Sequence, residues 1–157
     1  METNYRNIYK IARNTAGLTQ SRWAEMLGIS VESVGLYESG RGMPSDDVVA
    51  SMAEVAGLPV LGYWHLKLKS AVANDLLPDV EVVPLPQAVL KLLEELNDLD
   101  EKHVERSLVK IASDGKVSAE ESGLFASILS ELEDVIEAAL AVKFAQLGRI
   151  GPEGRAL

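Results

Sequence analysis

Residues 17–45 read GLTQSRWAEMLGISVESVGLYESGRGMPS and are punctuated as two short helices around a tight turn. Thr19 can N-cap the first helix, because a side-chain hydroxyl accepts a hydrogen bond from an unpaired backbone N–H at a helix start. Gly28 can end that helix in the left-handed backbone conformation. In the same way, Ser30 can N-cap the second helix and Gly40 can end it. The stretch therefore predicts helices over residues 20–27 and 31–39.

Helical periodicity continues on both sides of this stretch. Apolar residues at helical spacing predict a first helix that Gly17 ends, and Pro44-Ser45 followed by two aspartates predicts the start of a fourth. Pro59 then precedes a fifth helix, expected over residues 60–73. The apolar positions of the first helix are Tyr5, Ile8, Tyr9, Ala12 and Ala16.

Residues 5–58 resemble the lambda-repressor or Cro type of helix-turn-helix, also called the xenobiotic-response-element family. The matching text is Arg13, then GLTQSRWAEMLGIS, VESVGLYESGRGMPS and VVASMAEVAGL. The pattern also has a physical reason, since the small side chain of Ala24 lets two helices cross closely. The resemblance implies an all-α, five-helix lambda-repressor-like head over residues 1–73, with a recognition helix, about Val31–Ser39, in the major groove of DNA.

The resemblance also assigns DNA contacts by type. It implies that Gln20 contacts phosphate and that Arg41, in the loop after the recognition helix, suits phosphate too, as do backbone N–H groups at the helix starts, where Ser30 stands. Arg22 and Arg6 are expected to add electrostatic attraction. Reading of bases falls to four positions of the recognition helix, which are Val31, Glu32, Ser33 and Leu36.

These base-reading positions are an unusual set for the family. Val31 and Leu36 offer only apolar contact, best with a thymine methyl group, and Glu32 can accept a hydrogen bond from cytosine N4. No bidentate Arg–guanine or Gln–adenine contact is available. The set predicts a thin direct readout, supplemented by backbone contacts, DNA shape and dimerisation.

Arg13 and Glu38 correspond to family positions that form an ion pair between the first helix and the end of the recognition helix. Such a pair would fix the tilt of the recognition helix and keep Glu38 from facing phosphates unpaired. Two solvated charges are the alternative interpretation.

Aromatic and histidine residues have simpler interpretations. Trp23 is expected to pack in the core or at its edge, rather than to stack on a base. His65 and His103 stand alone, without a second ligand at metal spacing, so packing or solvated roles are favoured. In residues 63–69, YWHLKLK, the apolar side chains are expected to close the base of the head and the lysines to be solvated: Tyr63, Trp64, Leu66 and Leu68, with Lys67 and Lys69.

Residues 74–86, NDLLPDVEVVPLP, hold three prolines and are expected to form an extended linker. Helical periodicity returns from residue 87, with one apolar stripe running to about Ser113 and another from Leu124 to Leu147. Between the stripes, Asp114-Gly115 signals a turn, and Ser118 with Glu121 forms a capping box.

These features predict a long αα-hairpin over residues 87–148, with a disordered tail over 149–157. Two helices this rich in leucine and valine cannot bury both apolar stripes alone. We therefore expect the hairpin to be a dimerisation domain that forms a four-helix bundle with a second copy.

The charge of the chain is asymmetric. Residues 1–70 hold seven Lys/Arg and seven Asp/Glu, whereas residues 71–157 hold eight Lys/Arg and seventeen Asp/Glu. The net charge of −9 thus belongs to the second half and does not argue against DNA binding by the first. The chain has no cysteine, no run of signal-peptide length and no membrane span, which indicates a cytoplasmic protein.

No nucleophile–base pair, glycine-rich phosphate loop or pair of active-site carboxylates points to an enzyme, and neither a cofactor nor a metal is expected. The sequence favours a sequence-specific, DNA-binding transcriptional regulator that acts as a homodimer through residues 87–148. A bacterial or phage host follows from the resemblance alone. The alternative is a protein-interaction regulator, antitoxin-like or partner-binding, which binds DNA weakly and uses its acidic hairpin to bind another protein.

Overall fold

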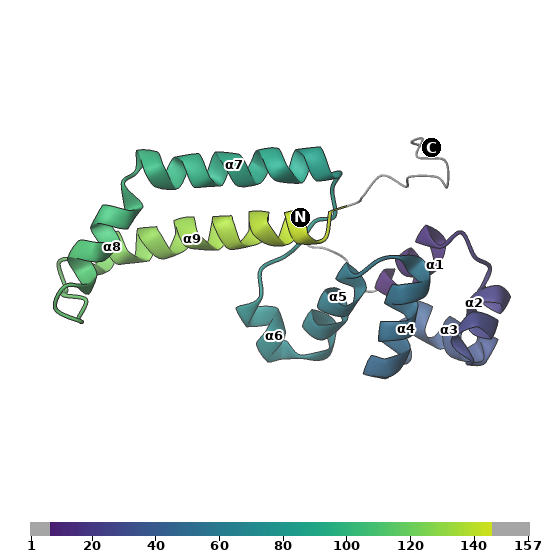
Figure 1. Ribbon diagram of the computed structural model, residues 1–157. Helices are drawn as coiled ribbons and strands as arrows, with labels where there is room; N and C mark the ends of the chain where they lie inside the picture. Colours follow the sequence, from purple (N-terminus) through teal and green to yellow (C-terminus); the bar gives the residue numbers. More distant parts are fainter. Residues whose placement is uncertain (1–6, 146–157) are drawn as a thin grey trace. The chain divides into compact units, whose positions relative to one another are not determined.

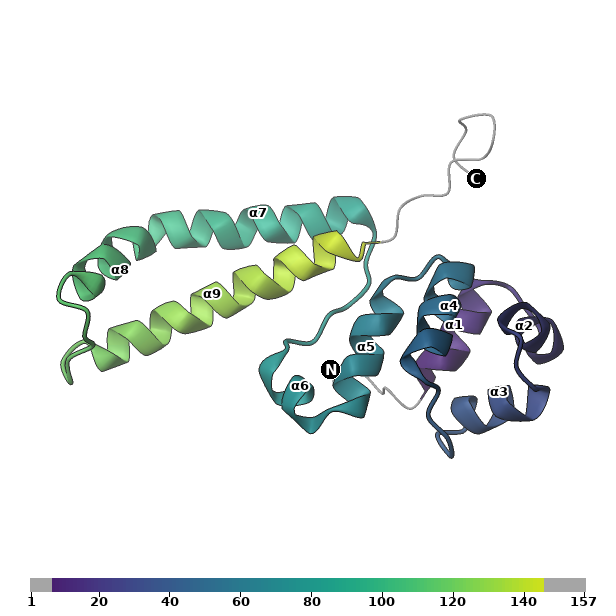
Figure 2. The same cartoon turned by 60° about the horizontal axis from the view of Figure 1, so that its bottom comes forward.

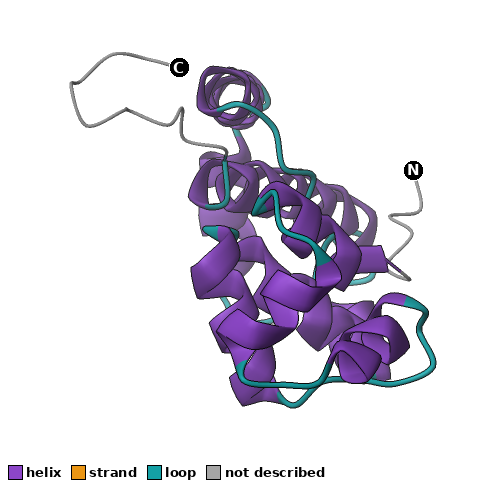
Figure 3. Ribbon diagram, turned by 90° about the vertical axis from the view of Figure 1, so that its right-hand side faces the viewer, coloured by secondary structure: helices purple, strands orange, loops and turns teal. Residues whose placement is uncertain are grey.

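The computed structural model describes residues 7–145, which divide after Leu77 into two compact units. Regular structure in these residues is entirely helical, as the purple ribbons of Figure 3 show. The N-terminal unit contains α1 to α6 and the C-terminal unit α7 to α9 (Figure 1). The predicted all-α fold class is confirmed.

The N-terminal unit begins with the helices that the glycine and cap pattern predicts. Thr19 Oγ1 accepts a hydrogen bond from Arg22 N at 3.3 Å, and Ser30 Oγ accepts from Ser33 N at 3.0 Å. Gly28 has a φ of 65°, the left-handed conformation that a residue with a side chain rarely adopts. The first four helices are α1 Ile8–Thr15, α2 Gln20–Leu27, α3 Val31–Glu38 and α4 Asp46–Ala56.

The core of the N-terminal unit is made of large apolar side chains drawn from every one of its first five helices. Trp23 is fully buried, which confirms its predicted packing role, and its indole Nε1 has no hydrogen-bond partner among the described residues. Burial of one such side chain contributes about 1.5 to 3 kcal/mol. The largest side chains in this core are Ile8, Trp23, Val34, Met52, Val60 and Leu61.

The fifth predicted helix is in fact two helices, α5 Val60–Lys69 and α6 Ala71–Leu76. Ser70 interrupts the helix with an extended backbone, φ −125° and ψ 117°, and its side chain caps α6 by accepting from Ala73 N. The expected continuous helix over 60–73 is therefore wrong, because Ser70 acts as a cap within it.

The interpretation of residues 63–69 also needs correction. Trp64 is buried as expected, but Leu66 is 48% and Leu68 37% exposed. Lys67 is only 5% exposed, and its Nζ donates to the Leu77 carbonyl oxygen at 2.7 Å. The buried ammonium thus ties the end of α6 back to α5, whereas the two leucines face outward.

The C-terminal unit is a hairpin formed by α7 Leu85–Glu101, α8 Val104–Ala112 and α9 Ser122–Lys143. Helices α7 and α9 run side by side in opposite directions, with α8 near the start of α9 (Figures 1 and 2). The expected single helix to about Ser113 is wrong, because His103 adopts φ 52° and breaks it. The predicted extended linker over residues 74–86 is likewise too long, since α6 includes residues 74–76 and α7 begins at Leu85, which leaves residues 77–84 between the two helices.

The turn between α8 and α9 follows the predicted chemistry. Ser118 N and Ser118 Oγ both donate to Glu121 Oε2, at 3.0 and 2.7 Å, and Glu121 N donates back to Ser118 Oγ at 3.2 Å. These bonds hold the pKa of Glu121 below its ordinary value. Arg6, Leu147 and the predicted disordered tail lie outside the described residues. No helix within residues 7–145 is long and apolar enough to cross a membrane.

Candidate nucleic-acid interface

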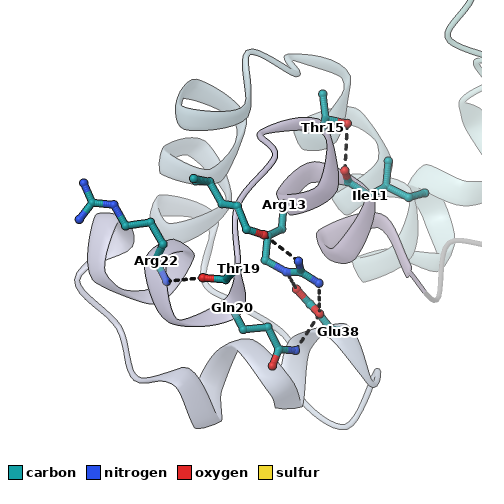
Figure 4. Close-up of polar contacts among 8 residues, drawn as sticks. Ile11, Arg13, Thr15, Thr19, Gln20, Arg22 and Glu38 are labelled. Atoms are coloured by element: carbon teal, nitrogen blue, oxygen red, sulfur yellow. Dashed lines mark hydrogen bonds and ion pairs between the residues drawn. The ribbon is translucent and has the colours of Figure 1, made fainter.

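Helix α3 is fixed at its C-terminal end by a cluster of three polar side chains (Figure 4). Arg13 Nε donates to Glu38 Oε1 at 2.5 Å, and Arg13 Nη2 donates to Glu38 Oε2 at 3.0 Å. Gln20 Nε2 donates to the same Oε2 at 3.0 Å. Arg13 Nη1 also donates to the Leu18 carbonyl oxygen at 2.8 Å. The cluster joins α1, the start of α2 and the end of α3.

The Arg13–Glu38 pair of this cluster is nearly closed to solvent, since the two side chains are 12% and 7% exposed. Burial alone would raise the pKa of Glu38, but the hydrogen bonds from Arg13 and Gln20 and the charge of Arg13 bring it below its ordinary value. The same bond to Glu38 raises the pKa of Arg13. The pair is therefore ionised at neutral pH, and its bidentate geometry restricts the orientation of α3.

The start of α2 carries Gln20, which the resemblance assigns to phosphate, and Arg22, which is expected to add electrostatic attraction. Gln20 is exposed, although its Nε2 is bonded to Glu38. Arg22 Nη1 donates to Glu25 Oε2 at 2.6 Å in a pair whose side chains are 57% and 67% exposed. Such an exposed pair contributes little free energy, so Arg22 can exchange Glu25 for another anion at low cost.

The start of α3 is formed by two serines. Ser30 Oγ accepts from Ser33 N at 3.0 Å, and the two hydroxyls lie 2.8 Å apart. Both hydroxyls are thus engaged in closing the helix start, while Val31 and Glu32 beside them are exposed, Val31 by 46%. The exposed end of α3 presents one apolar and one acidic side chain.

Leu36 lies in a more confined place than its neighbours at the helix start. It is half-buried, and a Cβ added to Gly42 would lie 3.3 Å from Leu36 Cβ. The loop after α3 therefore packs against Leu36, and the absence of a side chain at Gly42 is what permits this approach. Gly35, by contrast, has open space where a Cβ would point.

Arg41 is exposed in the loop that follows α3. Its Nε donates to Ser39 Oγ at 3.0 Å, and its backbone N donates to the Leu36 carbonyl oxygen at 3.0 Å. The local hydrogen bonds orient the guanidinium, whose remaining N–H donors have the planar geometry that suits phosphate.

Several features of this unit were not recognised from the sequence. The bond from Gln20 to Glu38 gives Gln20 a structural role in addition to the phosphate contact that the resemblance implies. The only signal of this bond in the sequence is the spacing of Arg13 and Glu38. Met26 and Met43 are 48% and 47% exposed, which adds two flexible apolar side chains to the surface.

His65 belongs to a polar chain that crosses the core. The Tyr9 hydroxyl lies 2.8 Å from His65 Nδ1, and His65 Nε2 lies 3.1 Å from Asp46 Oδ1. Lys69 Nζ donates to the same Asp46 oxygen at 2.7 Å, which, with His65, lowers the pKa of Asp46. Burial raises the pKa of Tyr9 to about 12. These hydrogen-bonded side chains link α1, α4 and α5. His65 is a buried packing residue, as predicted.

No group of three His, Cys, Asp or Glu residues within the described part of the chain is arranged to hold a metal ion.

Two short helices around a left-handed glycine, with an ion-paired brace across them, define a helix-turn-helix head. A model of the helix-turn-helix family matches residues 10–62, about a third of the chain. This part of the chain is therefore a helix-turn-helix domain of the lambda-repressor or Cro type, the class used by DNA-binding transcriptional regulators. The chain has no match among curated proteins or solved structures.

Proposed function

We propose that this protein is a sequence-specific transcriptional regulator that binds DNA as a homodimer, with α3 in the major groove. The resemblance of the head supports a bacterial or phage host and a cytoplasmic location. Whether the protein represses or activates depends on where its site lies relative to a promoter.

The Arg13–Glu38–Gln20 cluster is the observation that carries the proposal. A helix that reads base edges must keep one tilt, because a small rotation moves its side chains out of hydrogen-bond reach. The cluster braces the end of α3 against two other helices, and it also neutralises Glu38, which would otherwise repel phosphates. A brace of this kind leaves the start of α3 free to meet DNA.

Phosphate contacts in the proposal come from groups on either side of α3. Arg41 and Arg22 supply charge, and the backbone N–H groups at the starts of α2 and α3 supply hydrogen bonds. Gln20 contributes from the helix that crosses the backbone, while its amide continues to support Glu38. These contacts set the register on DNA without specifying its sequence.

Base reading in the proposal is concentrated at the start of α3. Val31 contacts a thymine methyl group and Glu32 accepts from cytosine N4, and both side chains are exposed there. Ser33 and Leu36 contribute less, because one hydroxyl is bonded to Ser30 and the other side chain is half-buried. The site is therefore expected to contain thymine or cytosine opposite α3, with further preference arising from DNA shape.

Selection of bound sequences from random duplex DNA tests this proposal directly. The full-length protein should enrich one motif, and Arg41→Ala and Gln20→Ala should weaken binding to that motif. Lys110→Ala is a matched control for Arg41→Ala, because it removes one exposed positive charge from the hairpin. Arg41→Ala should lower the salt slope of binding by about one, whereas the control should not. If no motif is enriched at modest salt, the regulator proposal fails.

Replacing a thymine of that motif by deoxyuridine tests the role of Val31. Loss of one methyl contact, worth about 0.8 kcal/mol, should weaken wild-type binding about fourfold. The Val31→Ala protein should be much less sensitive to the same replacement. Equal sensitivity would contradict the assignment of Val31 to a thymine methyl group.

A second candidate function is a protein-interaction regulator whose hairpin binds another protein. The excess of seventeen Asp/Glu over eight Lys/Arg in residues 71–157 favours it, since such a surface suits a basic partner. This candidate predicts that DNA selection yields no motif while the hairpin captures a basic protein.

A further inference from the structure

The hairpin of the C-terminal unit has two unlike flanks, which can be located from the line where its helices meet. On α7, Ala88 is fully buried and Leu92 and Leu99 are partly buried. On α9, Ala138 is fully buried, and Glu131 and Val135 are partly buried at helical spacing from it. The small alanines let the two helices approach closely, and these residues mark the line of contact between α7 and α9.

One flank of the hairpin carries ion pairs that cross between the helices. Lys91 Nζ donates to Glu137 Oε1 at 2.8 Å, and Lys102 Nζ donates to Glu131 Oε2 at 2.7 Å. Lys91 and Glu137 each lie one residue before a residue of the contact line. This charged flank is satisfied by the hairpin itself, and the partner carboxylates raise the pKa of both lysines.

The other flank is apolar and uncovered. On α7 it carries Val89, Leu93 and Leu96, which are 37%, 57% and 46% exposed. On α9 it carries Leu129 and Ile136, which are 44% and 51% exposed. We call these five residues the open flank.

The two halves of the open flank lie on the same side of the hairpin. Leu93 follows Leu92 of the contact line, and Ile136 follows Val135, so each is rotated by about 100° in the same sense about its own helix. Helices α7 and α9 run in opposite directions (Figure 2), so equal rotations bring both stripes to one side. The hairpin therefore presents an apolar face formed by both helices.

The acidic residues of α7 avoid this face, whereas on α9 the exposed Glu133 lies four residues after Leu129 and three before Ile136 and so borders it. On α7, Glu94, Glu95, Asp98 and Glu101 lie on the contact line, the charged flank or the back of the helix, and only Asp100 follows the stripe at its end. Between Val89 and Leu96 the stripe carries no charge. In a hairpin this acidic, the α7 half of the open flank is where a second copy would meet little like charge.

The size of the face also fits a stable interface. A 17-residue α7 is about 25 Å long, and two adjacent helices are about 20 Å wide, which gives a face on the order of 500 Å² before side-chain relief is counted. Two such faces would together bury on the order of 1,000 Å², which is at the lower end of the range for specific interfaces.

We propose that the open flank binds the open flank of a second copy, with the two hairpins related by a two-fold axis and the charged flanks outward. This inference rests on the proposed function in that it names the surface by which the homodimer forms. A second copy is the matching occupant because an identical face is equally apolar and equally long, and its α7 stripe carries no charge between Val89 and Leu96. Four helices then enclose the core that two leave open.

Thiol labelling of the full-length chain tests the assignment, because the protein has no native cysteine. Leu93→Cys places a thiol on the open flank, and Glu94→Cys places one on the adjacent residue away from it. In the dimer, Leu93→Cys should react with a maleimide at least tenfold more slowly than Glu94→Cys. Dilution below the dissociation constant should remove that difference. Equal rates in a protein that sediments as a dimer would overturn the assignment of the face.

Sedimentation equilibrium of Leu93→Glu supplies the second measurement. A carboxylate on the open flank has no partner in the dimer, so the dissociation constant should rise by about two orders of magnitude. Glu94→Gln is the control and should sediment like wild type. Because Leu93 is exposed in the single chain, helix content should be retained, which circular dichroism checks.

A wild-type protein that is monomeric at high concentration, or a dimer unaffected by Leu93→Glu, would overturn the inference. Its failure is distinct from failure of the proposed function. If a DNA motif is enriched but the protein is monomeric, only the dimer surface is wrong. If the dimer forms as described but no motif is enriched, the DNA-binding proposal is wrong and the surface assignment stands.

Discussion

The two units of this protein are both helical, but they differ in what they bury. The N-terminal unit encloses large side chains such as Trp23, Met52 and Leu61, each fully buried. In the body of the hairpin, the fully buried residues are the alanines Ala88 and Ala138, while Leu93 is 57% exposed. Five helices around a centre can close a core, whereas α7 and α9 meet along a line, and the hairpin's buried cluster of Val104, Ile111 and Ile128 lies at its α8 end. The comparison shows a head that closes its own core and a hairpin whose long helices leave apolar side chains exposed.

The largest expected effect on the head comes from its closed core. Met52→Ala should lower the free energy of unfolding by about 2 to 5 kcal/mol, because it removes a fully buried side chain and leaves a cavity. Both tryptophans lie in the head, so urea unfolding followed by tryptophan fluorescence measures this loss. Leu90→Ala is the control, since Leu90 is 68% exposed on the hairpin and should change the same transition by less than about 0.5 kcal/mol.

A smaller effect is expected from the ion-paired brace of the head. Glu38→Gln should cost about 2 kcal/mol at neutral pH, because it removes the charge that Arg13 and Gln20 bind. The folded pKa of Glu38 lies below its unfolded value of about 4.3, so the charged form contributes fully above about pH 5. That contribution is lost as the pH falls through the folded pKa.

The difference in stability between wild type and Glu38→Gln should therefore shrink as the pH falls from about 6 to about 3. Urea titrations at several pH values measure it. A difference that stays constant across this range would show that the charge of Glu38 does not stabilise the fold.

Tyr9→Phe should have the next effect, a loss of about 1 to 2 kcal/mol, because His65 Nδ1 is left without its buried partner. Fluorescence-detected unfolding provides the measurement. Ser51→Ala, which removes an exposed hydroxyl bonded to its own helix, is the matched control and should be nearly neutral. A neutral Tyr9→Phe would mean that another group satisfies His65.

The smallest effect is expected on the charged flank of the hairpin. The Lys91 and Glu137 side chains are 46% and 40% exposed, so Lys91→Met should cost less than about 1 kcal/mol, and less still at high salt. Circular dichroism during thermal unfolding at low and high salt measures this. A loss as large as that of Met52→Ala would contradict the view that this flank faces solvent.

The sequence predicts the head well because its helices are bounded by local signals. Thr19, Ser30 and Gly28 act through their own side chains or backbone freedom, so their effect can be read without the rest of the fold. The break at Ser70 has a local signal of the same kind, a serine that caps the next helix, but it was missed within the longer predicted helix. The break at His103 was missed because neither glycine nor proline marks it, although His103 adopts φ 52°.

The candidate site and the hairpin surface are predictable only in part. The pairing of Arg13 with Glu38 follows from the family resemblance, but the additional bond from Gln20 depends on how α2 meets α3. In the hairpin, periodicity places Leu92 and Leu93 in one broad apolar stripe. Which of them packs within the hairpin depends on the rotation of α7 against α9, and that is set by tertiary contacts.

Thermal unfolding observed by two probes over a hundredfold range of protein concentration tests the central comparison most directly. Tryptophan fluorescence reports the head alone, and far-ultraviolet circular dichroism reports all helices. If the head is complete and the hairpin requires a second copy, the fluorescence midpoint should not change with concentration. The midpoint temperature of the second transition seen by circular dichroism, which reports the hairpin, should rise by several degrees with protein concentration, because mass action favours the dimer. Two midpoints that are both independent of concentration would contradict this account.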